Sequence, residues 1–373
     1  MEKNVYFRLA EHLDNLPGGF PSTESGVEQR ILRRLFTSEE AEMATFLTLI
    51  PETPRVVAKR AGISRQEAAK RLESMAKRGL ILREEPEKGP FRYLAAQYVI
   101  GIWEFHVNDL DEALIHNMKE YAPTLSKESM KIPQLRVIPV ARSLTPQHKV
   151  LPHEMAEELA RSQKKFSVGP CICRREHSLI GKGCKKPEET CLGFGLAADF
   201  KIRNGIGRKI DLEETLDILK KADENGLVLQ PSNNKDALWI CCCCGCCCQV
   251  LKAFKRHPKP NTLAATPFVA HINPETCESC GTCVERCQME ALKIDNGSIS
   301  MNQDRCIGCG LCVSTCPTDS IALVRKPDRD QPQVYKDLVA MSIQQGKSRG
   351  KLTIGGLIKM AVKSKVDRIT TMG

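Results

Sequence analysis

The sequence predicts an α+β protein with a mostly helical N-terminal half, an irregular cysteine-rich middle segment and a C-terminal domain built from a ββα repeat. Three observations support this class. Capped segments with helical periodicity fill much of the first half of the chain. All nineteen cysteines lie between Cys171 and Cys316. Two of the cysteine runs have the same spacing and lie 29 positions apart, which indicates an internal duplication.

Residues 37–97 have the signals of three helices followed by a β-hairpin. Ser64-x-x-Glu67 is a capping box for a helix that runs to about Arg78, and Gly79 ends that helix. Two short apolar stretches separated by a Gly-Pro turn then predict the strands of a hairpin. Helix, helix, turn, helix and hairpin is the order of elements in a winged helix-turn-helix, so the sequence predicts a winged-helix-like domain.

The last of these helices has two interpretations. Arg65 and Gln66 stand where the recognition helix of such a domain contacts bases, which favours DNA binding. Acidic residues in the predicted wing would repel phosphate; they are Glu84, Glu85 and Glu87. The alternative is a docking module whose charges are solvated. DNA therefore stays a possible partner, and a protein partner is preferred.

Breakers and composition shifts divide the chain into six predicted parts. The stretch 167–170 marks the start of the cysteine-rich half. The parts are a helical lead-in (1–36), the winged-helix-like domain (37–97), a helical connector (98–166), a cysteine-rich cluster segment (167–260), the repeat domain (268–326) and a basic C-terminal tail (327–373).

Composition favours a cytoplasmic metalloprotein. No N-terminal signal and no run near the ~20 apolar residues of a membrane helix is present, so we expect no membrane span. In a reducing compartment, dense cysteine indicates metal or redox chemistry rather than disulfides. The formal net charge of +10 is offset once cysteines bind metal as thiolates, so it is weak evidence for nucleic acid. Oxygen-labile centres at this density suggest an anaerobic host.

The repeated runs have the spacing of iron–sulfur ligands. The first is Cys277-x2-Cys280-x2-Cys283-x3-Cys287, and the second is Cys306-x2-Cys309-x2-Cys312-x3-Cys316-Pro317. Three closely spaced thiolates plus a fourth suit [4Fe–4S] clusters. Zinc favours paired Cys-x2–4-Cys sites instead, so a pair of zinc knots is the weaker interpretation.

Residues 268–326 resemble a bacterial-type 2[4Fe–4S] ferredoxin. The resemblance implies two clusters, with the fourth cysteine of each run reaching the cluster of the other run. It assigns Cys277, Cys280, Cys283 and Cys316 to one cluster and Cys306, Cys309, Cys312 and Cys287 to the other. One departure is Gln288, which follows Cys287 where proline is usual. It removes no ligand.

The eleven cysteines upstream of this module suggest further centres. A third cluster is expected in a loop rich in glycine and lysine, with Cys171, Cys173, Cys184 and Cys191 as ligands.

The run 241–248 is too crowded for a single cubane, because adjacent side chains point in different directions. A subset could bind another cluster; its candidates are Cys241, Cys243, Cys244, Cys246 and Cys247. Gly245 permits a bend that would divide the run between two sites.

We expect two further clusters, four in all, with ligands shared between the loop and the run. The alternatives are one structural cubane or zinc with surplus free thiols, or a non-cubane or double-cubane centre. Consecutive cysteines also resemble the Cys-Cys-Gly motifs of heterodisulfide-reductase-type proteins.

The whole chain resembles a group of anaerobe proteins described as 4Fe–4S ferredoxin iron–sulfur binding domain proteins. Four stretches carry the resemblance: 16–21, 169–174, 189–195 and 241–248. It implies iron–sulfur clusters and electron transfer.

Three functions are consistent with these patterns. The first is an electron carrier of the polyferredoxin type that passes electrons singly from a donor protein to a partner oxidoreductase. The second is a redox-responsive DNA-binding regulator that uses the winged helix. The third is a catalytic subunit of an anaerobic oxidoreductase. No catalytic residue and no Gly-rich dinucleotide fingerprint is apparent, so a stand-alone enzyme is the less favoured interpretation.

Overall fold

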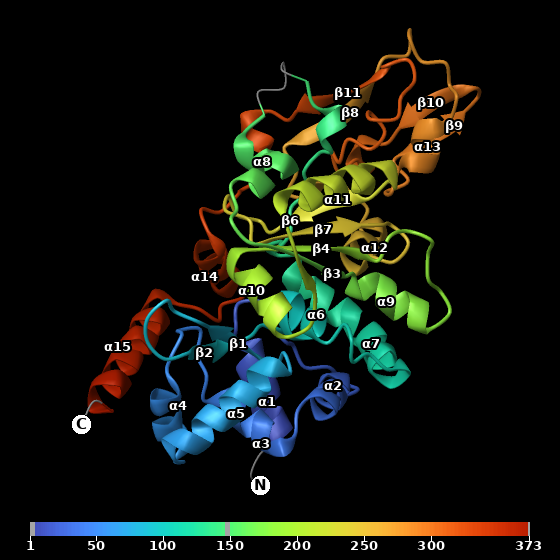
Figure 1. Ribbon diagram of the computed structural model, residues 1–373. Coiled ribbons are helices and arrows are strands. Elements are labelled where there is room, and N and C mark those ends of the chain that lie inside the picture. Colours follow the sequence, from blue (N-terminus) through green and yellow to red (C-terminus); the bar gives the residue numbers. More distant parts are fainter. Residues whose placement is uncertain (1–3, 146–149, 372–373) are drawn as a thin grey trace. The chain divides into compact units, whose positions relative to one another are not determined.

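A computed structural model describes residues 4–145 and 150–371 (Figure 1). The chain divides into two compact units. The first comprises Met1–Ile132, Arg203–Ile206 and Ser342–Gly373. The second comprises Pro133–Ile202 and Gly207–Met341, and it contains every cysteine of the chain.

The first unit begins with the helices of the N-terminal half. They are α1 (Val5–Asp14), α2 (Val27–Leu35), α3 (Ser38–Thr45), α4 (Pro54–Ala61) and α5 (Arg65–Lys77), followed by the antiparallel hairpin of β1 (Ile81–Glu84) and β2 (Arg92–Ala95). The order of elements after residue 37 is therefore the predicted one. Whether they act as a winged helix-turn-helix stays a prediction.

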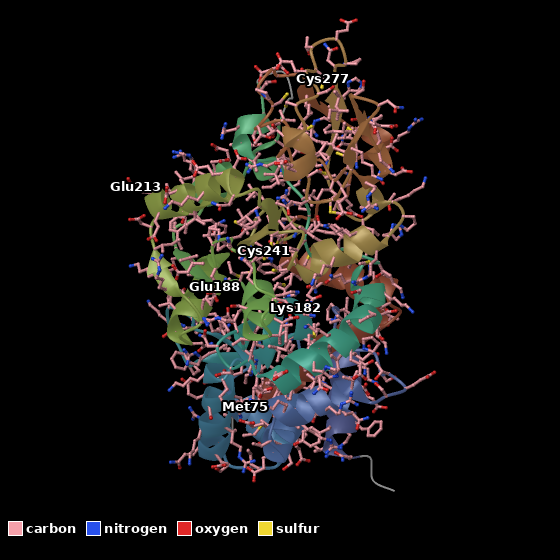
Figure 2. All side chains as sticks on the ribbon, turned by 90° about the vertical axis from the view of Figure 1, so that its right-hand side faces the viewer. Met75, Lys182, Glu188, Glu213, Cys241 and Cys277 are labelled. Atoms are coloured by element: carbon pink, nitrogen blue, oxygen red, sulfur yellow. The ribbon has the colours of Figure 1, made fainter. Side chains whose placement is uncertain are left out.

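Helix α5 shows why this segment folds as it does. The hydroxyl of Ser64 accepts a hydrogen bond from the backbone N–H of Glu67 at 3.1 Å, which caps the helix. The carboxylate of Glu67 instead accepts from Arg71 Nε at 2.5 Å, so only half of the predicted capping box forms. Leu72 and Met75 are fully buried on the inner face of the helix (Met75 is labelled in Figure 2).

Three aromatic rings pack together in the rest of the first unit. Phe20 lies edge-on to Tyr98 and Tyr121, at centroid distances of 4.7 and 5.0 Å. The remaining helices are α6 (Trp103–Phe105), α7 (Glu112–Ser129) and α15 (Ile354–Thr370), while α14 (Leu338–Ser348) spans the boundary between units. Helix α15 was not predicted, because the sequence indicated only a basic tail there.

The second unit is built on a five-stranded antiparallel sheet. Its strands are β3 (Phe166–Pro170), β4 (Glu189–Phe194), β5 (Arg208–Ile210), β6 (Val228–Pro231) and β7 (Trp239–Cys243), in the spatial order β5-β3-β4-β7-β6. Helices connect these strands: α9 (Ile172–Leu179), α10 (Gly195–Arg203) and α11 (Leu212–Glu224). Helix α8 (Ala156–Arg161) precedes the sheet in the chain, and α12 (Gln249–Arg256) follows it. Helix α11 packs on β3, β4 and β6 (Figure 1).

This sheet corrects the prediction of an irregular middle segment. The sequence predicted irregular backbone for the cysteine-rich segment 167–260, which includes the run 241–248. The first three residues of the run, Cys241–Cys243, instead belong to strand β7, which pairs with β4 on one side and β6 on the other. A buried thiol behaves as a small apolar side chain, so it is compatible with an interior strand whose backbone groups are paired.

The C-terminal part of the second unit has two small antiparallel sheets. Strand β8 (Phe268–Ile272) pairs with β11 (Ile321–Arg325), and β9 (Leu292–Asp295) pairs with β10 (Ser298–Met301). One short helix, α13 (Thr282–Arg286), follows the first cysteines of the repeat. These elements enclose an apolar cluster that includes Phe268 and Leu323.

Candidate metal centres

Two hollows in the C-terminal part are each lined by four cysteines. The first is lined by Cys287, Cys306, Cys309 and Cys312. The second is lined by Cys277, Cys280, Cys283 and Cys316. Each hollow thus takes three cysteines from one run and the last cysteine of the other run. These are the two sets that the resemblance to ferredoxins implies.

The backbone around the first hollow is shaped to approach its thiols. Gly308 has a φ of +62°, and a Cβ atom there would collide with the carbonyl oxygen of Phe268, so only glycine fits. The N–H of Ala270 donates to Cys306 Sγ at 3.4 Å, and the N–H of Ala291 donates to Cys287 Sγ at 3.3 Å. Such donors stabilise negative charge on cluster ligands, so the hollow fits an anionic group with thiolate ligands.

Burial also shows that these thiols need a cation in order to ionise. It raises the pKa of Cys309 to about 12, and it raises the pKa of Cys306 and Cys312 as well. Only the thiolate binds metal, so binding there releases protons and draws its free energy from the metal–sulfur bonds. None of the nineteen cysteines forms a disulfide.

Upstream, four thiols form one compact group, here called the four-thiol set. Its sulfur atoms all lie within 4.8 Å of one another, and those of Cys246 and Cys247 are 3.8 Å apart. The members are Cys184, Cys244, Cys246 and Cys247. Cys184 comes from the loop between α9 and β4, and the other three come from the turn after β7.

Six other thiols form a chain of contacts, here called the six-thiol set. In order of contact they are Cys171, Cys173, Cys248, Cys243, Cys241 and Cys191, and each thiol is hydrogen-bonded to the next. The fold explains this gathering. Cys191 and Cys241 are cross-strand partners on β4 and β7, and Cys241 and Cys243 share one face of β7 (Cys241 is labelled in Figure 2).

The helix ends supply the remaining members of the six-thiol set. Cys171 is the N-cap residue of α9, and Cys173 lies in the first turn of that helix. Cys248 is the N-cap residue of α12. The pKa of Cys248 is well below its ordinary value, because the thiols of Cys173 and Cys243 and nearby backbone N–H groups donate to its sulfur. A helix N-terminus favours negative charge in the same way.

A buried arginine faces both thiol sets. The side chain of Arg174 on α9 is only 3% exposed. Its Nη1 donates to Cys244 Sγ at 3.7 Å, and its Nη2 donates to the hydroxyl of Thr190 and the carbonyl of Cys242. Its Nε has no hydrogen-bond partner within the described residues. A guanidinium in this position needs nearby negative charge, which the thiolates can supply.

A buried lysine contacts the last thiol of the six-thiol set, Cys191. Lys201 on α10 is 8% exposed, and its Nζ donates to Cys191 Sγ at 3.0 Å and to the carbonyl of the same residue at 2.9 Å. Across residues 4–145 and 150–371, neither this lysine nor Arg174 forms an ion pair with a carboxylate.

The structure groups the upstream cysteines differently from the expectation drawn from sequence spacing. Cys184 lies with the turn of the 241–248 run and not with its three neighbours in the chain. Cys248 was missed, and its position just before a helix that starts at Gln249 was the available signal. Cys242 points to the other face of β7 and belongs to neither set.

Comparison with known proteins identifies the C-terminal module. Residues 270–323 match the family described as the 4Fe-4S dicluster domain. No curated protein and no solved structure matches the chain. The matched segment and the two four-cysteine hollows define an iron–sulfur protein with [4Fe–4S] cofactors. Within the described ranges, no helix is both long and apolar enough to span a bilayer.

Proposed function

We propose that this protein transfers electrons, one at a time, between a reduced donor protein and a partner oxidoreductase. The observation that carries the proposal is the pair of hollows, each lined by four cysteines from both halves of the repeat. When bound there, [4Fe–4S] clusters supply one-electron redox chemistry. The chain's part is to hold the clusters close together and to set their potentials through burial and N–H···S hydrogen bonds.

The lining of the hollows supports one assignment of the cluster ligands. Cys277, Cys280, Cys283 and Cys316 would hold one cluster, and Cys287, Cys306, Cys309 and Cys312 would hold the other. Because Cys287 and Cys316 each follow the run of the other cluster, the short segments 283–287 and 312–316 link the two centres covalently. This supports rapid exchange between them.

We propose that a redox partner docks on the side of Cys280. Of the eight ligand cysteines, Cys280 is the exposed one, whereas Cys283, Cys306 and Cys312 are buried. The hydroxyl of Thr282 lies 3.5 Å from its sulfur, and this contact lowers the pKa of Cys280. Electron transfer to a partner is favoured where the protein covering a cluster is thinnest.

DNA binding by the N-terminal helices receives less support. Most of the cations near α5 already have carboxylate partners. Arg71 pairs with Glu67 and Lys77 pairs with Glu73, while Arg78 pairs with Glu40. Paired cations attract phosphate weakly. We therefore propose that the helical N-terminal part docks proteins. We also propose a reducing compartment such as the cytoplasm, because dense cysteine there serves metal or redox chemistry rather than disulfides.

The test is anaerobic purification of the full chain, followed by iron and sulfide analysis and EPR of the dithionite-reduced protein. We expect at least about eight iron atoms per chain and the interacting signals of two adjacent reduced clusters. Reduced protein should then reduce a one-electron acceptor such as cytochrome c. Fewer than about four iron atoms, with cysteine-bound zinc in the C-terminal module, would overturn the proposal.

The DNA alternative has its own measurement. A mobility-shift assay at about 50 and 200 mM salt, with the clusters oxidised and reduced, should show no binding that depends on redox state. Redox-dependent binding that Arg65→Ala abolishes would favour the regulator instead.

A further inference from the structure

We propose that the upstream cysteines form two centres of different nuclearity: one zinc ion in the four-thiol set, and one iron–sulfur cluster in the six-thiol set. The cluster would add a redox centre to the proposed electron-transfer function. The zinc site does not depend on that function.

The spacing of the four-thiol set fits a single tetrahedral ion. Zinc–thiolate bonds of about 2.3 Å place the four sulfur atoms about 3.8 Å apart. The sulfur atoms of Cys246 and Cys247 are at 3.8 Å, and all four in the set lie within 4.8 Å of one another. A cubane binds each thiolate through a different iron, so its core keeps the four sulfurs farther apart.

The ferredoxin module provides an internal comparison for cubane ligands. Its eight cysteines surround two hollows. Within the described part of the chain, no three of these eight sulfurs lie mutually within 4.8 Å, since the four-thiol set is the one group that meets this criterion. This arrangement, in which no three sulfur atoms of a set lie mutually within 4.8 Å, is here called open spacing. Only the four-thiol set, among the described residues, has its sulfur atoms closer together than this.

The six-thiol set has the open spacing. Its thiols touch in sequence, but among the described residues no three of them meet the 4.8 Å criterion. A zinc site, mononuclear or with bridging thiolates, needs tetrahedral groups of mutually close sulfurs. The six-thiol set therefore does not fit zinc. It fits a polynuclear cluster that separates its ligands, and it offers two more thiols than the four that a cubane requires.

Charge supports a permanently anionic centre at the six-thiol set. Lys201 contacts Cys191 Sγ at 3.0 Å from a buried position without a carboxylate partner in the described residues. An uncompensated ammonium there would be strongly unfavourable. Thiolates of a bound cluster remain ionised at any pH at which the cluster is intact, so they compensate this charge permanently.

Arg174 is the counter-charge that the two centres share. Its buried guanidinium donates through Nη1 to Cys244 Sγ at 3.7 Å, and Cys171 and Cys243 also face it. Cys244 belongs to the four-thiol set, and the other two belong to the six-thiol set. A four-thiolate zinc site and a four-thiolate cubane each carry net negative charge, so one guanidinium stabilises both.

The experiment compares three variants of the full chain, purified without oxygen and analysed for zinc, iron and sulfide. Cys184→Ser removes one ligand of the four-thiol set. The triple variant Cys173→Ser/Cys243→Ser/Cys248→Ser leaves only three members of the six-thiol set. Cys242→Ser is the matched control, because it lies in the same run but in neither set. EPR signals of the ferredoxin clusters report whether each variant is folded.

We expect Cys184→Ser to lose about one zinc per chain and keep all its iron, and the triple variant to lose about four iron atoms and keep its zinc. Cobalt(II) added to zinc-depleted wild-type protein should give the visible absorption of a tetrahedral thiolate site, and Cys184→Ser should abolish it. Loss of iron from Cys184→Ser would overturn the zinc assignment. Unchanged iron in the triple variant would overturn the cluster assignment. Either overturning result can be obtained while the EPR signals of the ferredoxin clusters are intact. Failure of this inference can therefore be distinguished from failure of the proposed electron-transfer function, in which those signals would be absent.

Discussion

Gly245 donates its backbone N–H to the side-chain Oε1 of Gln288 at 2.7 Å. This bond joins the turn of the cysteine run to the ferredoxin module within one compact unit. A Cβ atom at Gly245 would lie 2.5 Å from the carbonyl oxygen of Gln288, so the approach requires glycine. Gln288 stands where such modules usually have proline, and proline has no side-chain acceptor. The departure from the ferredoxin pattern thus serves to attach the two parts.

Gln288→Leu should loosen this attachment. The buried N–H of Gly245 would lose its acceptor, at a cost of about 1–3 kcal/mol. We expect faster amide hydrogen exchange in 244–248, measured by mass spectrometry on the iron-loaded protein. Gln288→Glu, which keeps an acceptor, is the control. If both variants exchange like the wild type, the bond does not hold the turn.

Gly308→Ala should damage the first hollow of the ferredoxin module. The new Cβ would meet the carbonyl of Phe268 and would also sit on a backbone with φ of +62°. Gly297→Ala is a matched control, since its φ is +77° but no atom lies within 4 Å of the added Cβ. The control should cost about 1–2 kcal/mol from backbone strain alone. We expect iron content to fall in Gly308→Ala and to stay at the wild-type value in Gly297→Ala; equal iron content would show that the close approach is unimportant.

Arg174→Gln should lower the reduction potential of the iron–sulfur centre that we propose for the six-thiol set. Removing a buried positive charge makes the addition of an electron less favourable. We expect a fall of roughly 60 mV or more, a tenfold change in the equilibrium, in an EPR-monitored redox titration. Arg175→Gln is the control, because Arg175 is 37% exposed and pairs with Glu188 at 2.7 Å. A potential that is unchanged in Arg174→Gln, or lowered equally in both variants, would contradict this role.

The stability of the first unit should depend on pH through His12. Burial lowers the pKa of His12 to about 4 from an ordinary value of 6.5, and its Nε2 has no hydrogen-bond partner among the described residues. Between these pKa values the unfolded chain binds more protons than the folded one, so the free energy of unfolding rises with pH.

The contribution of His12 is therefore complete above about pH 6.5 and is lost as the pH falls toward 4, by up to about 3 kcal/mol. Hydrogen exchange of α1 amides, corrected for the intrinsic rate, should reveal this loss. His12→Gln should flatten the dependence, and His116→Gln, at an exposed site on α7, should not. An unchanged slope in His12→Gln would assign the dependence to other groups.

Much of the fold was predictable where the relevant signals are local. Caps and breakers placed α5, which begins after Ser64 and ends before Gly79, whereas helix α15 of the same unit was not predicted. The sheet of the second unit was missed because its strands are short and pair across long separations, as when Cys191 meets Cys241. A run of cysteines also has no alternation of polar and apolar residues, so it gives no period-2 signal.

The spacing of the repeated runs by itself indicated two groups of iron–sulfur ligands, and the resemblance to ferredoxins assigned these cysteines to the two crossed sets that line the hollows. The grouping of the upstream thiols was decided only by the tertiary structure. The pairing of β4 with β7 brings Cys191 to Cys241, and the turn at Gly245 directs Cys244, Cys246 and Cys247 toward Cys184. Neighbours in sequence are thereby sent to different sites, since strand alternation and a tight turn orient consecutive side chains in different directions.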